Sequence, residues 1–136
     1  MTKKALVGVP AALLLILGSP GAAHADDGYG HCNAASDDAG GEDCTVSFFN
    51  GQNVHVSEMD FYANGERMFL RDHYADGRGI VAEIGALSKW WANTGGAGTT
   101  YEAPLPDITE GQTIAIKVCQ TDNGSWLNCV TVYATA

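Results

Sequence analysis

The end of the chain contains two apolar segments whose cysteines and hydrophobic residues predict the same β-hairpin register. The segments are residues 113–119 (TIAIKVC) and 129–135 (CVTVYAT). Placing Cys119 opposite Cys129 in an antiparallel pair also places Val118 opposite Val130, Ile116 opposite Val132 and Ile114 opposite Ala134. A slip of one residue would turn every side chain to the other face, so agreement between the two registers is strong evidence. The sequence therefore predicts a disulfide-linked hairpin and an antiparallel β fold.

This register also predicts which side of the hairpin faces the core. The apolar residues form one face and must point inward: Ile114, Ile116, Val118, Val130 and Val132. The disulfide is then expected on the outward face, together with Lys117, Thr131 and Tyr133. Residues 120–128 between the cysteines are expected to form a rigid loop that presents Trp126.

The first 25 residues have the organisation of an export signal. Lys3 and Lys4 precede an apolar stretch, and Ala23-His24-Ala25 provides the small-x-small pattern that a signal peptidase cuts after. A membrane anchor is the alternative, but the apolar stretch of roughly 13 residues is shorter than the ~20 needed to span a bilayer. We expect cleavage after Ala25 and a secreted, extracellular protein of residues 26–136.

All four cysteines lie after the predicted cleavage point, as expected in an oxidising compartment. The hairpin register selects Cys119–Cys129, which leaves Cys32–Cys44 as the second disulfide. A zinc site is the alternative use of four thiols. The sequence separations of 10 and 12 residues lack the C-x-x-C pairs typical of such sites. We therefore predict two local disulfides and no metal.

The mature chain would be strongly acidic. It keeps five basic side chains against 16 carboxylates, a net charge of −11 with neutral histidines. Nucleic acid and anionic lipid attract basic patches, so neither is expected as a partner.

Residues 44–136 alternate between apolar and polar side chains in short stretches separated by turn residues. The expected strands are 45–49, 54–62, 67–74, 80–84, 89–92, 99–103 and the two hairpin arms. Seven or eight short strands with regular turns are typical of an all-β antiparallel β-sandwich, Ig-like or a small barrel. Residues 80–91 also fit a short helix, although flanking glycines disfavour it.

Residues 26–43 show no alternation and are rich in glycine and aspartate. We interpret them as an acidic N-terminal arm that Cys32–Cys44 ties to the first strand, and residues 44–136 as the sandwich domain. An extended arm of this kind suits insertion into a partner's groove, with Tyr29 as its one aromatic side chain.

Tryptophans are the other candidate binding residues. Successive residues of a strand point to opposite faces, so one of Trp90 and Trp91 can enter the core while the other faces a partner. The alternative, equally open, is that both pack in the core or across a strand crossing. Trp126 provides a second exposed ring, and binding is favoured over packing if it lies beside an outward Trp90 or Trp91.

Catalytic chemistry is not predicted. No serine has the turn context of a nucleophile, and His73 beside Asp72 is typical of a solvated loop pair. Asp72 with Asp76-Gly77 contains fragments of a calcium loop but lacks the EF-hand spacing. We expect no catalytic residues, no cofactor and no metal ligands.

Several segments together resemble small secreted proteins of filamentous bacteria. They are 76–82 (DGRGIVA), Trp90-Trp91, 93–99, 109–113 (TEGQT), 118–120 (VCQ) and 132–136 (VYATA). The proteins resembled are disulfide-bonded β-sandwiches, and some are similar to the adaptor subunit of umbrella-shaped antibacterial toxin particles. That resemblance implies a lectin-like partner whose cleft takes the N-terminal arm, and a helical-repeat stalk of a large toxin subunit against the sandwich.

The sequence therefore predicts a non-enzymatic, secreted protein-binding module, with an adaptor role as the leading hypothesis. Two alternatives remain open. A disulfide-stabilised β domain can present rigid loops as an inhibitor of an extracellular hydrolase. Trp90 or Trp91 with Trp126 can serve as sugar platforms in a small carbohydrate-binding module.

Overall fold

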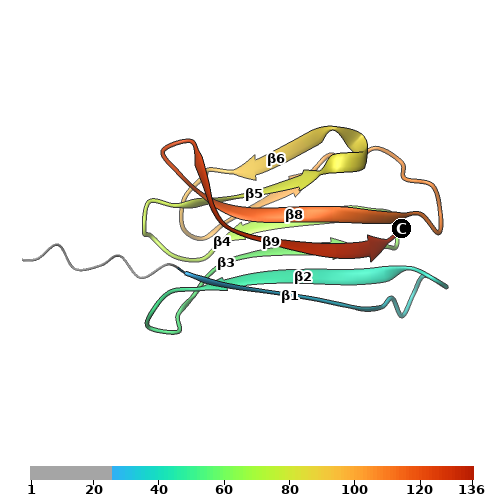
Figure 1. Cartoon of the computed structure of the whole chain (residues 1–136), viewed down its shortest axis with the longest axis horizontal. Coiled ribbons are helices and arrows are strands. Elements are labelled where there is room, and N and C mark those ends of the chain that lie inside the picture. The colour runs from blue at the N-terminus through green and yellow to red at the C-terminus, as the bar shows by residue number, and fades with distance from the viewer. Residues whose placement is uncertain (1–25) are drawn as a thin grey trace, which may run out of the picture.

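The computed structural model describes residues 26–136, which form two antiparallel β-sheets packed face to face (Figure 1). The five-stranded sheet has the order β1-β2-β3-β4-β7, with β1 (Asp27–Ala34), β2 (Glu42–Phe49), β3 (His55–Tyr62), β4 (Arg67–Asp72) and β7 (Thr99–Ala103). The four-stranded sheet has the order β6-β5-β8-β9, with β5 (Gly79–Ile84), β6 (Lys89–Asn93), β8 (Thr113–Asp122) and β9 (Ser125–Thr135). The predicted all-β antiparallel sandwich is confirmed.

Alternation along the strands decides which side chains fill the space between the sheets. In β2, Val46 and Phe48 are fully buried, whereas the intervening Ser47 is only partly covered. In β8 the core positions are Ile114, Ile116 and Val118, as the sequence pattern predicts. Residues 80–91, which also fitted a helix, form β5 and β6 joined by the short 3-10 turn η1 (Gly85–Leu87).

The interpretation of residues 26–43 as an arm or long loop is wrong for its first half. Asp27–Ala34 pairs with β2 along its whole length and forms an edge strand of the five-stranded sheet. This strand accounts for the nine strands seen among the described residues, against the seven or eight expected. The sandwich therefore begins near residue 27, not at residue 44.

Glycines explain why β1 showed no apolar alternation. A Cβ atom on Gly28 would lie 2.5 Å from Cγ2 of Val130, and one on Gly30 would lie 2.6 Å from Cγ1 of Val132. These positions face the other sheet, but β9 approaches so closely that no side chain fits. The inward face of β1 thus consists of Gly28, Gly30 and Cys32. These residues do not produce the alternation of large apolar side chains that predicts a strand.

The terminal hairpin has the predicted register. Val118 pairs with Val130, Ile116 with Val132 and Ile114 with Ala134, and all three pairs are those predicted. Towards the turn, β9 carries one extra residue, so that Asn128 and Cys129 both lie opposite Cys119. This is a β-bulge, and Asn128 takes a positive φ of 52° there.

The expected loop of residues 120–128 is wrong. The strands continue beyond the disulfide to Asp122 and Ser125, and Asn123 and Gly124 form the turn between them. Their φ angles of 48° and 82° fit a two-residue type I′ turn, which matches the twist of the flanking strands. Trp126 therefore lies on β9 rather than in a presented loop.

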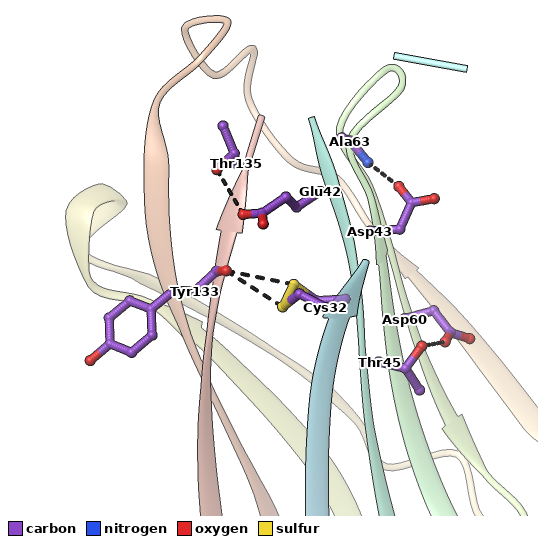
Figure 2. Close-up of a disulfide and its surroundings, with 9 residues drawn as sticks. Cys32, Glu42, Asp43, Thr45, Asp60, Ala63, Tyr133 and Thr135 are labelled. Atoms are coloured by element: carbon purple, nitrogen blue, oxygen red, sulfur yellow. Dashed lines mark hydrogen bonds between the residues drawn. A yellow bond between two sulfur atoms is a disulfide. The ribbon is translucent and has the colours of Figure 1, made fainter. Parts of the chain in front are cut away.

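Both predicted disulfides are present, and each joins neighbouring antiparallel strands. Cys32 lies directly opposite Cys44 in the β1–β2 pair. The two sulfur atoms lie 3.4 and 3.8 Å from the carbonyl oxygen of Tyr133 on β9. Figure 2 marks both contacts with dashed lines. Beside them, the Thr135 hydroxyl donates to Glu42 Oε2 at 2.9 Å. This disulfide thus closes the side of the sandwich where β1 and β9 meet.

The second disulfide, Cys119–Cys129, links β8 and β9 beside the bulge. Cys129 is exposed, whereas Cys119 is buried but lies outside the core between the sheets. The predicted leader, residues 1–25, lies outside the described residues. In the part that is described, no helix is long and apolar enough to cross a membrane.

Candidate functional site

The four aromatic residues proposed from the sequence do not form one site. Trp91 is 8% exposed and packs in the core, because it lies opposite Ala82 on the inward face of β5. Trp90 points the other way and is 60% exposed on the outer face of the four-stranded sheet. Tyr29, also 60% exposed, lies on β1 of the other sheet. The predicted division of the Trp90-Trp91 pair between core and surface is therefore what the structure shows.

Trp90 and Trp126 come together although their strands are at opposite edges of the sheet. Their ring centroids are 6.2 Å apart with an interplanar angle of 73°, an edge-to-face arrangement. Three strand spacings of about 4.8 Å separate β6 from β9 in a flat sheet. The bulge at Asn128 increases the twist of the hairpin, and Figure 1 shows its tip rising to the level of β6. Bending of the hairpin thus brings the two indoles side by side.

This outer face carries a small apolar layer of its own. Val81 and Cys119 are paired across β5 and β8, are almost fully buried and lie outside the core cluster. They point to the same side as Trp90 and Trp126, and we infer that the indoles cover them. The tryptophans are therefore held by packing below while their upper surfaces remain open, with Trp126 still 36% exposed.

A cation lies against the indole pair. Lys117 Nζ is 5.5 Å from the centroid of the Trp126 ring, within the range of a cation–π contact. Glu83 lies between Trp90 and Lys117 in the cross-strand register. The resulting surface, formed by Trp90, Trp126, Lys117 and Glu83, is called the indole surface here. It combines exposed aromatic area with one charge of each sign.

A second aromatic row crosses the outer face of the five-stranded sheet. Tyr29 meets Phe49 edge to face at 6.0 Å, Phe49 stacks on His55 at 5.0 Å, and His55 lies 4.6 Å from His73, all between ring centroids. The four rings come from β1, β2, β3 and the residue after β4. Of these four residues the sequence predicts a binding role for Tyr29 alone, because only the strand order places the other rings beside it.

His73 is exposed and lies just after β4, as the sequence predicts, but its ring also lies beside that of His55. Burial, and next the nearby His55, lowers the pKa of His73 from its ordinary value of 6.5. Its amide donates to the Val56 carbonyl at 2.9 Å, which continues the sheet pairing by one residue beyond β4. This bond fixes the backbone of His73 beside β3, where its ring lies 4.6 Å from that of His55.

A charged network occupies the middle of the same outer face. Arg71 on β4 contacts Asp60 and lies 3.2 Å from Glu58 Oε1, both on β3. The Thr45 hydroxyl donates to Asp60 Oδ1 at 2.8 Å. The guanidinium of Arg71 also lies 5.4 Å from the centre of the Phe69 ring. Pairing of β2 with β3 and of β3 with β4 brings these side chains together on one face. They belong to no local sequence motif that could have predicted the network.

The fragments of a calcium loop serve as turn acceptors. Asp72 Oδ1 accepts from the Tyr74 amide at 3.1 Å, and Asp76 Oδ1 accepts from the Arg78 amide at 2.9 Å. Asp72 is buried, and this burial raises the pKa of its carboxyl group. Both carboxylates thus stabilise the β4–β5 connection.

The described residues therefore carry an aromatic area on the outer face of each sheet: the Trp90–Trp126 pair on one and the row from Tyr29 to His73 on the other. The ring pair Trp90–Trp126 fulfils the condition under which the sequence favoured binding over packing. Comparison with protein-family models, with curated proteins and with solved structures gave no match to this chain.

Proposed function

We propose that this protein is a secreted, non-enzymatic adaptor that binds one protein partner on each sheet of its sandwich. The observation that carries the proposal is the position of two exposed aromatic areas on opposite outer faces: the indole surface around Trp90 and Trp126, and the row that begins at Tyr29. A module that joins two components needs two surfaces that can be occupied at once. Opposite faces of one sandwich satisfy that condition.

The indole surface has the composition of a protein-binding hot spot. Tryptophan is enriched among residues that dominate binding energies, and rings held rigidly lose little entropy on binding. Val81 and Cys119 are buried on the same outer face, and we infer that they underlie Trp90 and Trp126. Because Cys119 of this layer is bonded to Cys129, β8 and β9 are covalently linked beneath the surface before any partner arrives.

An extracellular location is supported by the cysteines and by the leader. Two disulfides fit an oxidising, extracellular setting. Secretion itself rests on the predicted signal peptide of residues 1–25.

The resemblance to adaptor subunits of antibacterial toxin particles names candidate partners, a lectin-like subunit and a repeat-stalk toxin subunit. One part of that picture has to change. Residues 27–34 belong to the sheet, so they are not a free arm that enters a lectin cleft. In our proposal the partner on this side meets the outer face of β1 at Tyr29.

Affinity capture from culture supernatant with single variants tests the adaptor hypothesis. The wild-type protein should retain two different partners in stoichiometric amounts. Trp90→Ala should abolish capture of one partner and Tyr29→Ala capture of the other. Each substitution should weaken the binding free energy by about 2 kcal/mol or more, as for hot-spot residues. Tyr62→Ala is the matched control, because Tyr62 is an exposed aromatic residue outside both areas and should release neither.

Recovery of the wild-type protein alone, at its monomer mass, would contradict the adaptor hypothesis. Loss of both partners in either variant would also contradict it, since each area should serve one partner.

Carbohydrate binding is the second candidate, favoured by the openness of the Trp90 ring. In that case soluble polysaccharide should shift the tryptophan fluorescence of the wild-type protein, and Trp90→Ala should remove the shift. A flat titration would exclude this function.

A further inference from the structure

Two histidines and a glutamate meet at one end of the five-stranded sheet. His55 begins β3, Glu58 lies three residues later on the same strand, and His73 follows directly after β4. One ligand atom from each of them lies within 4.8 Å of the others. Residues three apart on a regular strand point to opposite faces, so this meeting requires an explanation.

A β-bulge in β3 provides that explanation. Phe48 pairs with Ser57 and Phe49 pairs with His55, which leaves Val56 as one extra residue on β3. Val56 and Ser57 are both buried, and His55 is turned to the outer face on which Glu58 lies. Bulges commonly re-aim a side chain in this way next to functional sites.

The distance between His55 and Glu58 suits a tetrahedral ion. His55 Nε2 and Glu58 Oε2 are 3.4 Å apart. Two ligand atoms that each lie about 2.1 Å from a tetrahedral zinc ion are themselves about 3.4 Å apart. The two atoms form no hydrogen bond in the structure, and His55 Nε2 is a buried nitrogen without any hydrogen-bond partner. A buried imidazole nitrogen is costly to leave unsatisfied, and a metal ion would satisfy it.

Neighbouring groups hold two of the three side chains in place. Glu58 Oε1 accepts from Arg71 at 3.2 Å, and Glu58 Oε2 accepts from the Ser47 hydroxyl at 3.4 Å. The Phe49 ring stacks on His55 with an interplanar angle of 23°. Such outer contacts orient metal ligands and strengthen binding. Asp60 also contacts Arg71 and partly neutralises the cation nearest the site.

We propose that His55, Glu58 and His73 bind one Zn²⁺ ion with three protein ligands and leave a fourth position to water. Two imidazoles and one carboxylate are a ligand set that zinc accepts. His73 is exposed, so the open position faces solvent. The sequence alone predicts no metal ligands here, because this set depends on the β3 bulge and on the β3–β4 pairing.

Calorimetric titration of the purified, untagged protein with ZnCl₂ tests the site directly. We expect saturation at one Zn²⁺ per chain, and a loss of affinity of about tenfold or more in His73→Ala and in Glu58→Gln. His31→Ala is the matched control, because His31 is exposed on β1 of the same sheet but lies outside the cluster, and it should bind Zn²⁺ as the wild type does. Absence of saturable binding, or binding that survives in His73→Ala, would overturn the proposal.

A second measurement does not depend on how well the variants fold. In NMR spectra of the wild-type protein, Zn²⁺ should shift the imidazole signals of His55 and His73 together, with His31 unchanged. Shifts confined to His31 would overturn the proposal. Zinc binding is measured without any partner, so its outcome is independent of the adaptor hypothesis.

Discussion

Two glycines determine how closely the first strand approaches the opposite sheet. At Gly28 and Gly30 the space that a side chain would need is already filled by Val130 and Val132 of β9. The loss of backbone entropy at a strand glycine is offset here by direct packing between two edge strands. Glycine therefore acts as a core residue in β1, although a glycine-rich stretch without apolar alternation predicts a loop.

Gly28→Ala is expected to destabilise the protein by about 1–3 kcal/mol, because an added methyl in a filled space forces neighbouring atoms apart. Its Cβ would lie 2.5 Å from Val130 Cγ2 and 2.7 Å from Phe48 Cε1. Gly85→Ala is the matched control, since no atom lies within 4 Å of a Cβ placed there. Urea unfolding should show a lower midpoint for the first variant only; equal midpoints would contradict the packing role of Gly28.

The tryptophan pair shows what strand parity can and cannot predict. Alternation indicates that one of Trp90 and Trp91 faces the core, but it does not say which one. The choice follows from the β5–β6 register, in which Trp91 lies opposite Ala82 and Trp90 opposite Glu83. That register depends on the length of the Gly85–Leu87 turn, which the sequence alone left open.

Among the elements, the terminal hairpin was the most predictable and β1 the least. In the hairpin, two independent signals, the cysteines and the alternating apolar residues, specify one register. The bulge at Asn128 was not predictable, because the cysteine pair suits an uninterrupted ladder equally well. In β1 the anchoring groups are polar and distant in sequence, so no local pattern reveals them.

A chain of polar contacts ties the start of β1 to the other sheet. Asp26 Oδ2 accepts from Gln120 Nε2 and from Arg78 Nη1, each at 2.7 Å. Gln120 Oε1 in turn accepts from Asn128 Nδ2 at 2.8 Å. Asp26 and Gln120 are both buried, and a buried polar group without a hydrogen bond would destabilise the fold. Each of the two side chains provides the other with a partner.

Asp26→Asn should destabilise the fold by about 1–3 kcal/mol, because it weakens two charge-assisted hydrogen bonds at a buried position. Asp27→Asn on the exposed neighbouring residue is the control and should change stability little. Thermal unfolding of both variants measures the difference. If both melt together with the wild type, Asp26 does not anchor β1. Removal of residues 26–34 is likewise expected to weaken the fold rather than delete a free arm.

At the scale of the whole molecule, the order of the strands creates the surfaces. The fold class follows from alternation and turn spacing, which are local properties of the sequence. The indole surface and the His55–Glu58–His73 cluster instead combine residues from different strands, together with bulges that add one residue. Pairing between strands and bulge positions are non-local, so composition and spacing could name the individual side chains but not the groups that they form.

The acidity of the molecule has a local consequence at the β3–β4 turn. Partial burial, followed by the charges of Asp107, Glu110 and Asp38, raises the pKa of Glu66 above its ordinary value of 4.5. A carboxyl group whose pKa is higher in the folded state favours folding when it is protonated. This stabilising contribution is present at low pH and is lost as the pH rises through the folded-state pKa. At neutral pH the ionised Glu66 therefore weakens the fold.

Glu66→Gln should accordingly raise stability at pH 7, by no more than about 0.5 kcal/mol because solvent screens a largely exposed charge. The gain should disappear near pH 3, where the native carboxyl group is protonated and resembles the amide. Thermal unfolding across this pH range measures the effect, with Glu83→Gln on the other sheet as the control that lacks these three acidic neighbours. A gain of equal size at both pH values would mean that the amide packs better than the carboxyl group, and that charge repulsion between β3–β4 and residues 107–110 contributes nothing.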